Sequence, residues 1–542
     1  MRKPIILGTL LFLATSAAQE CPVTGGTATI AQNSEPGNLN PLIFPTTYDT
    51  NIEELVFNTL VAPTADLNYE PELAESWTFS EDKKTLTLKL HNGVTWHDGE
   101  PLTASDVAFT LTAIAEPNYN GGAYSQVEVL EGAAAYQAGE ADSVSGIEVV
   151  DDTTIALTTT EVYAPILATL AGIMILPEHI YGEIPVENWQ TDETNRNPVG
   201  SGPFAFGEFR SGELISLSAN ENYFEGRPCL DRLIVRFGDA NTMLAALVSG
   251  EVDAAPVPVP SVASVEGNPD LTLTTVEQLS FDYVGTNLRN PILADQTVRT
   301  AMAQAINREA IVSGLMSGFG TVVDTIFPKS HWAYPQDVAP IPYDPEGAAA
   351  MLEEAGWTMN GGVRSKDGQD LRFRLFYTTG NPVRERGAAV IQANLKQLGV
   401  EVELQSMDFP TLVTYLLPKD DKGTPRAVEP SDFDLFILGF GIERDPSEYL
   451  SYFTAAGQPP NGYNFTGYTD PAGGDLLVQG QETIDTDDRT KLYNDFGLLM
   501  REELPWIPLA QPQALYGNGS RLHNFAPDIR GVNVGVTTWW VD

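Results

Sequence analysis

Cysteine is scarce in this sequence of 542 residues, which contains only Cys21 and Cys229, so at most one intramolecular disulfide can form. Histidine is also rare. None of the five histidines has the spacing to a second ligand that is typical of metal sites; they are His91, His97, His179, His331 and His523. We therefore expect no cofactor and no metal site built from protein side chains alone. A metal complex held by few protein ligands remains an alternative.

Catalytic motifs are missing as well. The sequence contains no G-x-S-x-G, no H-E-x-x-H and no phosphate-binding P-loop. Ser80 and Lys83 match the S-x-x-K pattern of β-lactamases, but they stand in a polar turn and no K-T-G element follows. We therefore expect a protein that is not an enzyme, and a secreted hydrolase is the competing class.

Positive charge is in short supply. Thirty Lys and Arg residues face 73 Asp and Glu residues, which gives a formal net charge of −43. A surface of this sign repels nucleic acids and anionic lipids, so neither is an expected partner. The acidic residues are dispersed along the chain, and we interpret most of them as a solvated surface.

No stretch after the N-terminus has 18 apolar residues free of charge, so the sequence predicts no transmembrane helix. The N-terminus itself has the pattern of a secretory signal. Arg2 and Lys3 precede an apolar run over residues 4–14, and small residues follow at 16–18. We expect residues 1–18 to be a signal peptide that is cleaved near Ala18, so that the protein is exported.

Cys21 stands close to the expected mature N-terminus, where a lipid-modified cysteine would require a small residue before it. Glu20 occupies that position, so we expect a soluble protein and not a lipoprotein. An exported chain meets an oxidising compartment, and a disulfide between Cys21 and Cys229 is the first expectation. Two unrelated buried thiols are the alternative.

Strand and helix patterns alternate along the chain, which indicates an α/β protein of two or three domains. Residues 77–90 read as a hairpin, and Thr103 with Asp106 is a helix-capping pattern. Further helices are expected after Asp344 and over residues 382–398. The apolar run 433–438 reads as a strand with a loop behind it.

Six ordered segments carry a resemblance to a known family: "PELAESWTFSEDKKTLTLKLHNGVTWHDGEPLTASDVAFTL" (71–111), "NPVGSGPFAF" (197–206), "NENYFEGRPCLDRLIVRF" (220–237), "LVSGEVDA" (247–254), "VRTAMAQAINREAI" (298–311) and "YDPEGAAAMLEEAGW" (343–357). They resemble the extracellular solute-binding proteins of the peptide, oligopeptide and nickel group, which serve ABC importers. The resemblance implies an α/β fold, the two-lobed periplasmic binding protein of type II, with an additional subdomain in lobe I. It also places the two cysteines where some relatives have a disulfide.

The domain limits that the resemblance implies are lobe I over 19–280, lobe II over 281–505, and a return to lobe I over 506–542. The inserted subdomain is expected at about 45–190. By the same resemblance the protein is a periplasmic, monomeric receptor that closes over a short peptide and delivers it to ABC permease subunits in the inner membrane. A sugar, an opine or a nickel chelate is the alternative ligand.

On lobe I, the resemblance implicates Glu35 and Pro36 in the loop "SEPGNLNP" (34–41), which lines the pocket of oligopeptide-binding relatives. A plain turn with a solvated glutamate is the alternative. Tyr283 is placed near the cleft, although an aromatic at strand spacing also fits a core position. Tyr463 and Asn464 fit a ligand-facing loop, and turn chemistry alone explains them too.

The stretch "GFGIERDPSEYL" (439–450) occupies the place where peptide-binding relatives carry a Gly-Trp-x-x-Asp pattern, whose aspartate meets the ammonium group of the peptide. Here Gly439, Phe440 and Glu443 stand at those positions, with Gly441 between them, and the loop is about one residue shorter. We expect Glu443 to anchor the ligand amine and Phe440 to form the wall beside it. The alternative is that Glu443 pairs with a surface base such as Arg444.

Overall fold

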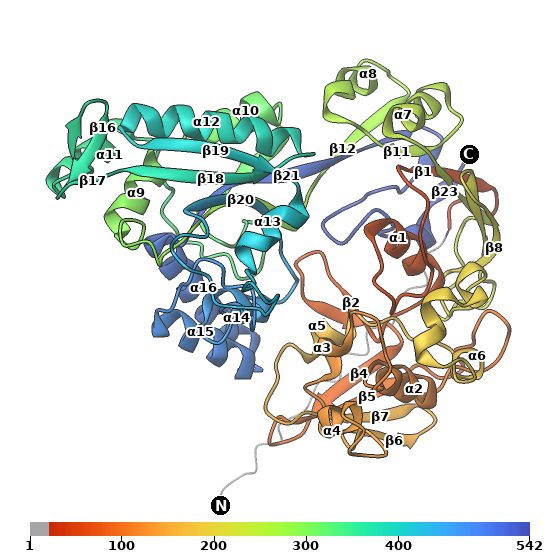
Figure 1. The fold of residues 1–542 in the computed structure, drawn as a ribbon. Coiled ribbons are helices and arrows are strands. Elements are labelled where there is room, and N and C mark those ends of the chain that lie inside the picture. The colour runs from red at the N-terminus through yellow and green to blue at the C-terminus, as the bar shows by residue number, and fades with distance from the viewer. Residues whose placement is uncertain (1–20) are drawn as a thin grey trace, which may run out of the picture.

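Two groups of strands lie side by side in the computed structural model, which describes residues 21–542, and a pair of long strands joins them (Figure 1). The expected signal peptide, residues 1–18, lies outside the described residues. The strands follow one another in a single hydrogen-bonded order: β19 (Glu401–Met407), β18 (Arg372–Thr378), β20 (Leu435–Gly441), β13 (Ser280–Thr286), β21 (Trp506–Gly519), β11 (Ala254–Pro256), β1 (Thr27–Gln32), β10 (Arg232–Phe237), β9 (Leu214–Ala219) and β8 (Phe204–Arg210).

The long strand β21 belongs to both groups. Its first residues, from Trp506, pair with β13, and its last residues pair with β11 and with β12 (Leu271–Glu277). We call the group containing β1 and β8 to β12 lobe I, and the group containing β13, β18 to β20 and the short β14 (Gly320–Val322) lobe II. The fold is therefore the two-lobed α/β architecture that the sequence predicts.

The two connecting strands are tied together between the lobes. The N–H of Gln278 donates to the carbonyl of Pro512 (3.1 Å), and the side-chain amide of Gln511 donates back to the carbonyl of Gln278 (2.8 Å). We call residues 278–279 and 511–513 the hinge. Strand β14 also pairs with β21 here, opposite Gln511 and Pro512, so the hinge is held on the side of lobe II as well.

Parallel pairing and crossover helices organise lobe II. Strand β18 pairs in parallel with β19 and with β20, and α12 (Pro382–Leu398) connects β18 to β19. Gly399 ends α12 at φ +87°, as expected from the sequence. The other helices of this lobe are α9 (Gln296–Ala305), α10 (Arg308–Leu315), α11 (Pro345–Glu354), α13 (Phe409–Leu416), α14 (Leu450–Phe453), α15 (Pro471–Glu482) and α16 (Thr486–Glu503).

One expectation for lobe II needs correction. The strand predicted over 433–438 is β20, Leu435–Gly441, so the Gly439-Phe440-Gly441 stretch is part of the strand and not of the loop. These three residues pair with Ser280, Phe281 and Asp282 of β13. The sequence pattern ended the strand too early because glycines normally interrupt a strand.

A four-stranded sheet forms a separate layer of lobe I, below the main sheet in Figure 1. Its order is β4 (Ala74–Phe79), β5 (Thr85–Leu90), β7 (Thr154–Thr158) and β6 (Ile147–Asp151), so the hairpin predicted at 77–90 is confirmed. Thr103 and Asp106 cap α2 (Ala104–Ile114) as expected. The smaller elements nearby are β2 (Val61–Pro63), β3 (Tyr69–Pro71), α3 (Tyr124–Val127), α4 (Ala133–Gln137), α5 (Ile166–Leu170) and α6 (Glu178–Tyr181).

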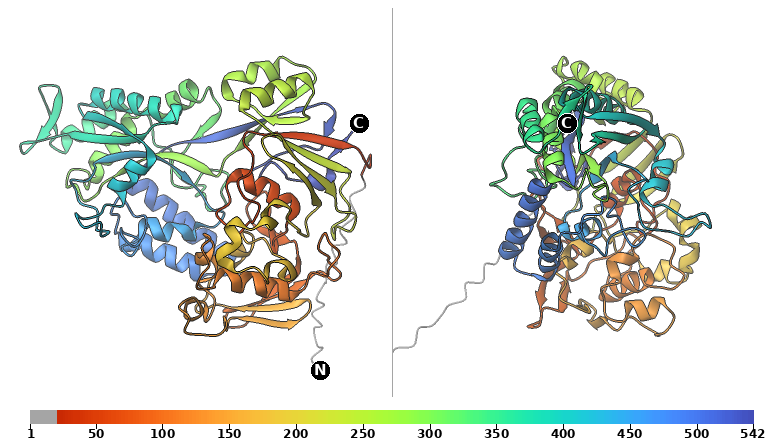
Figure 2. Two further views of the ribbon diagram at one scale, coloured as in Figure 1. Left: turned by 45° about the vertical axis from the view of Figure 1, so that its right-hand side comes forward. Right: turned by 60° about the vertical axis from the view of Figure 1, so that its left-hand side comes forward.

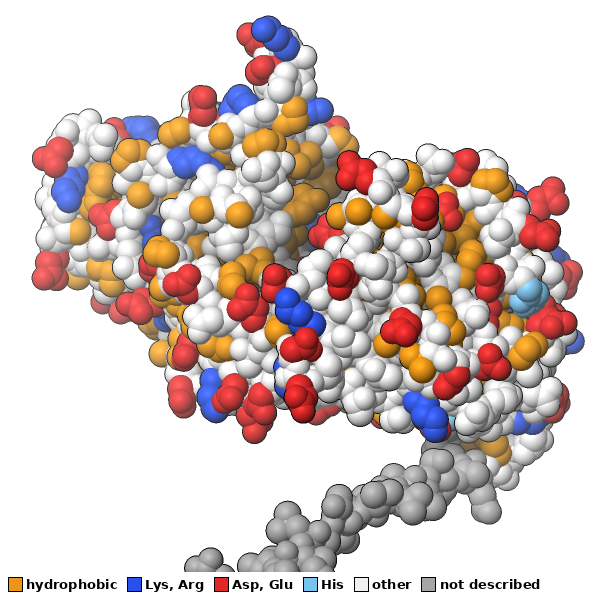
Figure 3. All heavy atoms as spheres, turned by 90° about the horizontal axis from the view of Figure 1, so that it is seen from below, with side chains coloured by type: hydrophobic (Ala, Val, Ile, Leu, Met, Phe, Trp, Pro, Cys, Tyr) orange, Lys and Arg blue, Asp and Glu red, His pale blue; other side chains and the backbone are white. Residues whose placement is uncertain are grey.

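Cys21 and Cys229 are joined by a disulfide, as expected, and their Cα atoms are 5.4 Å apart. The bond fixes the start of the described chain to the turn before β10. Within residues 21–542, no helix is both long and apolar enough to cross a membrane. Acidic side chains are scattered over both lobes on the face drawn in Figure 3, which agrees with the dispersed charge of the sequence.

Candidate ligand-binding site

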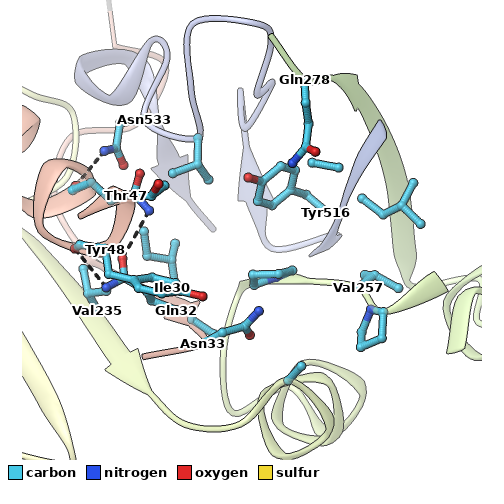
Figure 4. Close-up of a pocket in the computed structure, with 18 of the residues that line it drawn as sticks. Ile30, Gln32, Asn33, Thr47, Tyr48, Val235, Val257, Gln278, Tyr516 and Asn533 are labelled. Carbon is cyan, nitrogen blue, oxygen red and sulfur yellow. Dashed lines mark hydrogen bonds between the residues drawn. The ribbon is translucent and has the colours of Figure 1, made fainter. Parts of the chain in front are cut away.

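A cavity of 480 Å³ lies where β1, the start of α1 (Thr47–Val56) and the hinge come together (Figure 4). Its walls combine aliphatic side chains with amides and phenols. Among them are Ile30, Asn33, Tyr48, Val257, Gln278 and Tyr516. Pockets that bind small ligands typically measure about 300–1,000 Å³ and are mostly apolar with a few polar groups. We call this space the lobe I cavity.

A chain of amide hydrogen bonds holds one wall of the lobe I cavity in place. The Gln32 side chain donates to the carbonyls of Ser34 (2.8 Å) and Tyr48 (3.0 Å), and it accepts a bond from Asn51 (3.2 Å). Asn533 in turn donates to the carbonyl of Asn51 (2.7 Å). The end of β1, the first turns of α1 and the C-terminal segment are thereby fixed to one another.

On lobe II, the candidate binding feature is the loop that follows β20 and contains Glu443 and Arg444. Its main chain is held by two neighbouring rings: Trp332 donates to the carbonyl of Arg444 (2.8 Å), and Nε2 of His331 donates to the carbonyl of Glu443 (3.3 Å). The other ring nitrogen of His331 accepts a bond from Ala333 N–H, which defines the donor. Burial lowers the pKa of His331 to about 4, so the ring is neutral in this role.

Glu448 lies directly beneath this loop and accepts a hydrogen bond from the N–H of Glu443 (2.7 Å). Burial raises its pKa to about 9; the hydrogen bond from Glu443 opposes this shift, and the charges of Glu443 and Asp445 add to it. Glu448 is therefore protonated at neutral pH. The Glu443 carboxylate itself is on an exposed residue and takes part in none of the ion pairs of the described chain.

Aromatic rings pack together beside Glu443 and Glu448. We call the rings of Tyr452 and Tyr463 the floor of the lobe II site. Tyr452 stacks on Tyr463 (5.6 Å between ring centroids) and meets Phe440 edge to face (5.0 Å). Phe440 is 6% exposed and also packs on Trp506, whereas Tyr463 is 49% exposed. Phe440 thus supports the floor from below, and Tyr463 presents its ring to solvent.

Asp445 and Pro446 have a structural role at the start of the next helix. Asp445 caps the short 3-10 helix Pro446–Tyr449 by accepting the N–H of Ser447 (2.9 Å). Its carboxylate also forms a two-point ion pair with Arg489 of α16, at 2.6 and 2.8 Å. A buried, fully paired carboxylate of this kind holds the loop and is not free to bind a ligand.

Arg444 reaches from this loop toward lobe I. It lines a cavity of 280 Å³ together with Glu54 and Glu72 of lobe I. Burial raises the pKa of Glu54, and the Arg444 guanidinium lowers it in part. The N–H of Ala164 in lobe I donates to the carbonyl of Gln481 in α15 (2.8 Å), so the two lobes also touch far from the hinge. Figure 2 shows α14 to α16 beside the part of lobe I that contains the four-stranded sheet.

Glu35 and Pro36, the residues expected in the pocket on lobe I, lie apart from the lobe I cavity. The Glu35 carboxylate accepts bonds from the Gly212 N–H (2.6 Å) and from the Ser211 hydroxyl (3.1 Å), in the turn between β8 and β9. Both residues line a different hollow, of 620 Å³, on lobe I. In this structure the Glu35 carboxylate stabilises the turn between β8 and β9, and a role of Glu35 and Pro36 in ligand binding stays a prediction.

Tyr283 and Asn464 are buried inside lobe II. Tyr283 is 2% exposed and stacks on Trp506 at 4.0 Å. Asn464 has no exposed surface; its amide donates to the carbonyls of Thr454 (2.8 Å) and Tyr468 (2.6 Å). Both side chains are part of the interior of lobe II.

Gly439 and Gly441 differ in the space that surrounds them. A side chain at Gly439 would collide with the guanidinium of Arg384, which pairs with Asp282 at 2.8 Å. Gly441 is exposed, and a Cβ atom there would meet nothing within 4 Å. A side chain at position 439 would therefore displace the Arg384 guanidinium, whereas Gly441 leaves open space.

Sequence reasoning missed Glu448, Tyr452 and most of the lobe I cavity. The sequence did contain one signal for Glu448. Asp445 and Glu448 are three residues apart, which is the spacing of a capping box, in which the side chain of the second residue folds back toward the start of the helix. No such signal exists for Gln278 and Tyr516, because the cavity brings together segments that are hundreds of residues apart in the sequence.

Two lobes, two connecting strands and a cavity at the hinge define the class of the molecule as a two-lobed solute-binding protein. A family model, described as "Bacterial extracellular solute-binding proteins, family 5 Middle", matches residues 68–461. The chain belongs to this family, which confirms the resemblance found in the sequence.

Known proteins resemble this chain over nearly its whole length. The oligopeptide-binding protein AppA of Bacillus subtilis is 30% identical, over 96% of this chain and 92% of its own, and the dipeptide-binding protein of Escherichia coli is 27% identical, over 93% and 92%. The structure of AppA in complex with a nonapeptide matches with a TM-score of 0.72 at 29% identity, covering 96% of this chain and all of that one.

A further solved relative has a ligand of another class. NikZ from Campylobacter jejuni, in complex with Ni(L-His), matches with a TM-score of 0.73 at 25% identity, over 95% of this chain and 99% of its own. Among residues 21–542, no three His, Cys, Asp or Glu side chains are grouped in a way that could hold a metal ion.

Proposed function

We propose that this protein captures short peptides between its two lobes and delivers them to the permease of an ABC importer. The observation that carries the proposal is the lobe I cavity at the hinge of a chain that belongs to family 5 and is 30% identical to an oligopeptide-binding protein. Closure of the lobes would bury the ligand, and the closed form would be the one that the permease recognises.

In this proposal the amino terminus of the peptide binds at lobe II. Glu443 is exposed, and its loop is fixed by His331 and Trp332, so the carboxylate is available at a defined place. A charge-assisted hydrogen bond to a ligand ammonium is worth roughly 1.5–3 kcal/mol once closure excludes water. Tyr463 supplies the aromatic surface beside the anchor, with Phe440 packed behind it, and Gly441 leaves room for the ligand.

The second carboxyl group, Glu448, strengthens the anchor in this proposal. An ammonium group near Glu443 would favour ionisation of Glu448, because opposite charge stabilises the charged form of an acid. The site would then offer two carboxylates to the bound ligand while carrying one when empty.

The protein works outside the inner membrane in this account, as a soluble periplasmic monomer whose signal peptide is removed near Ala18. Its partners are the peptide and the permease subunits, and it binds without turning its ligand over. A nickel chelate is the second candidate ligand, because NikZ is 25% identical and its structure contains Ni(L-His).

A mixed pool of short peptides tests the proposal. The purified protein is incubated with the pool, its melting temperature is followed, and the pool is analysed by mass spectrometry before and after. We expect the melting temperature to rise, because a ligand that binds only the folded state stabilises it. The pool composition should stay constant. Persistent cleavage of the pool, or stabilisation by nickel–histidine and by no peptide, would contradict the proposal.

A further inference from the structure

The lobe I cavity is free of charged side chains. Twenty-one residues of the described chain line it, and none of them is Asp, Glu, Lys, Arg or His. The sequence as a whole contains 30 basic and 73 acidic residues. The 280 Å³ cavity, in contrast, contains Glu54, Glu72, Arg444 and Arg530, and the 620 Å³ hollow contains both acids and an arginine.

The lining supplies other kinds of contact. Aliphatic side chains come from β1, β10, the segment 256–259 and β21; they include Ile30, Val235, Val257 and Leu515. The polar groups are amides, phenols and the hydroxyl of Thr47. The Gln32 amide donates to two neighbouring carbonyls and accepts a bond from the Asn51 side chain, so part of the polar capacity is used within the wall.

A charged side chain entering such a space loses its hydration and finds no opposite charge there. The cost of burying an ion without a partner is far larger than that of burying a neutral amide or an aliphatic group. An aliphatic side chain gains free energy in proportion to the apolar area that it buries. The cavity therefore discriminates by charge and not only by size.

We infer that the lobe I cavity receives uncharged, mainly aliphatic side chains of the ligand and rejects Lys, Arg, Asp and Glu at those positions. The inference rests on the proposed function, since it assumes that the ligand is a peptide, and it specifies which peptides are bound. In the proposed function, the ligand ammonium is recognised at Glu443 of lobe II, outside this cavity.

Desolvation in the cavity and the electrostatic field of the whole protein have opposite expected effects on the affinity for peptides that contain lysine. The net charge of −43 attracts cations and repels anions at long range. If that field governed selectivity, peptides with lysine would bind better than neutral ones, and peptides with glutamate would bind worse. If the uncharged cavity governs it, both charged residues weaken binding.

The test uses tetrapeptides of alanine and leucine with a free amino terminus. Positions 2 to 4 are replaced one at a time by Lys, by norleucine as its neutral counterpart, by Glu, and by Gln as its neutral counterpart. Affinities come from isothermal titration calorimetry. At one or more positions we expect Lys to bind at least tenfold more weakly than norleucine, and Glu at least tenfold more weakly than Gln.

Gln278 provides a charge-swap variant, because its side chain is exposed, lines the cavity and makes no hydrogen bond within the described chain. Q278E should restore binding of the lysine peptide to within about threefold of the norleucine peptide, and it should weaken the glutamate peptide further. Q278K should restore binding of the glutamate peptide to within about threefold of the glutamine peptide, and it should weaken the lysine peptide further. The matched controls are Q369E and Q369K, at an exposed residue of β17 (Gln369–Asp370) in lobe II, and they should leave all ratios unchanged.

Three other outcomes overturn the inference, and they can be told apart. If charged and neutral tetrapeptides bind within threefold of each other at every position, the inference is wrong while peptide binding stands. If lysine strengthens and glutamate weakens binding, the overall field governs selectivity instead. If the neutral parent peptide does not bind at all, the proposed function itself fails, and the inference fails with it.

Discussion

The N–H of Glu443 donates to the carboxyl group of Glu448 at 2.7 Å, so the main chain of the exposed Glu443 is bonded to the partly buried Glu448. Burial raises the pKa of Glu448 to about 9, so Glu448 is protonated at neutral pH. This arrangement gives the loop a fixed geometry and a charge that can respond to a bound cation.

Replacing Glu443 by Gln removes the proposed ammonium anchor and keeps the size of the side chain. E443Q should weaken binding of a free-amine peptide at least tenfold, which corresponds to about 1.4 kcal/mol. An N-acetylated form of the same peptide should be nearly unaffected. Calorimetric titration measures both, with E354Q on the exposed surface of α11 as the control. Equal affinity of E443Q and the wild type for the free-amine peptide would show that the anchor lies elsewhere.

Glu448 predicts a pH dependence of stability. Its folded pKa lies above the value of 4.5 for an exposed glutamate, so between about pH 4.5 and 9 the unfolded state has lost a proton that the folded state keeps. The free energy of unfolding should therefore fall with rising pH in this range, by at most about 1.4 kcal/mol per pH unit from this group. E448Q should be less sensitive, as chemical denaturation at pH 5 and pH 8 would reveal. If the free energy of unfolding changed with pH by the same amount in the wild type and in E448Q, the pKa of Glu448 would not be raised.

The same group predicts proton release on binding. If a ligand ammonium favours the ionised form of Glu448, binding at pH 7 should release protons into the solution. Titrations in buffers of different ionisation enthalpy measure this release, which should be lost in E448Q. A wild-type heat that does not depend on the buffer would exclude coupling between Glu448 and the ligand.

The ion pair between Asp445 and Arg489 should contribute strongly to stability. Both side chains are less than 10% exposed, and removing one partner leaves a buried charge without compensation. R489M should lower the free energy of unfolding by about 3–5 kcal/mol. The exposed pair of Lys491 with Asp488 on the same helix is the control, and K491M should cost less than about 1 kcal/mol. Similar losses for both variants would contradict this difference.

The disulfide between Cys21 and Cys229 closes a long loop, with a sequence separation of 208 residues. Its main effect is to restrict the unfolded chain, and loop-closure entropy sets an upper limit of roughly 4–5 kcal/mol for a loop of this length. The C21S/C229S double variant should be less stable by up to this amount while keeping its peptide affinity. Two titratable thiols in the denatured, unreduced wild-type protein would show that the bond is not formed.

Local features of the structure could be predicted from the sequence, because they depend on neighbouring residues. The capping box of Thr103 with Asp106 and the end of α12 at Gly399 are of this kind. The fold class followed from motifs spread along the whole chain. The burial of Tyr283 and Asn464 could not be predicted, since an aromatic or an amide at loop or strand spacing fits a core as well as a cleft.

The site was harder to predict than the fold because its parts come from distant segments. Gln278 and Tyr516 line one cavity although 238 positions separate them in the sequence, and the pairing of β12 with β21 brings their segments together. Glu35 had the right chemistry for a binding loop, but the turn between β8 and β9 uses its carboxylate.

Calorimetric titration of the wild-type protein with the alanine–leucine tetrapeptide, followed by mass spectrometry of the recovered peptide, tests the central claim most directly. The account predicts saturable binding of one peptide per protein molecule and recovery of the peptide intact. No binding of this or any other short peptide, or recovery of cleaved fragments, would contradict the account of a peptide-capturing receptor.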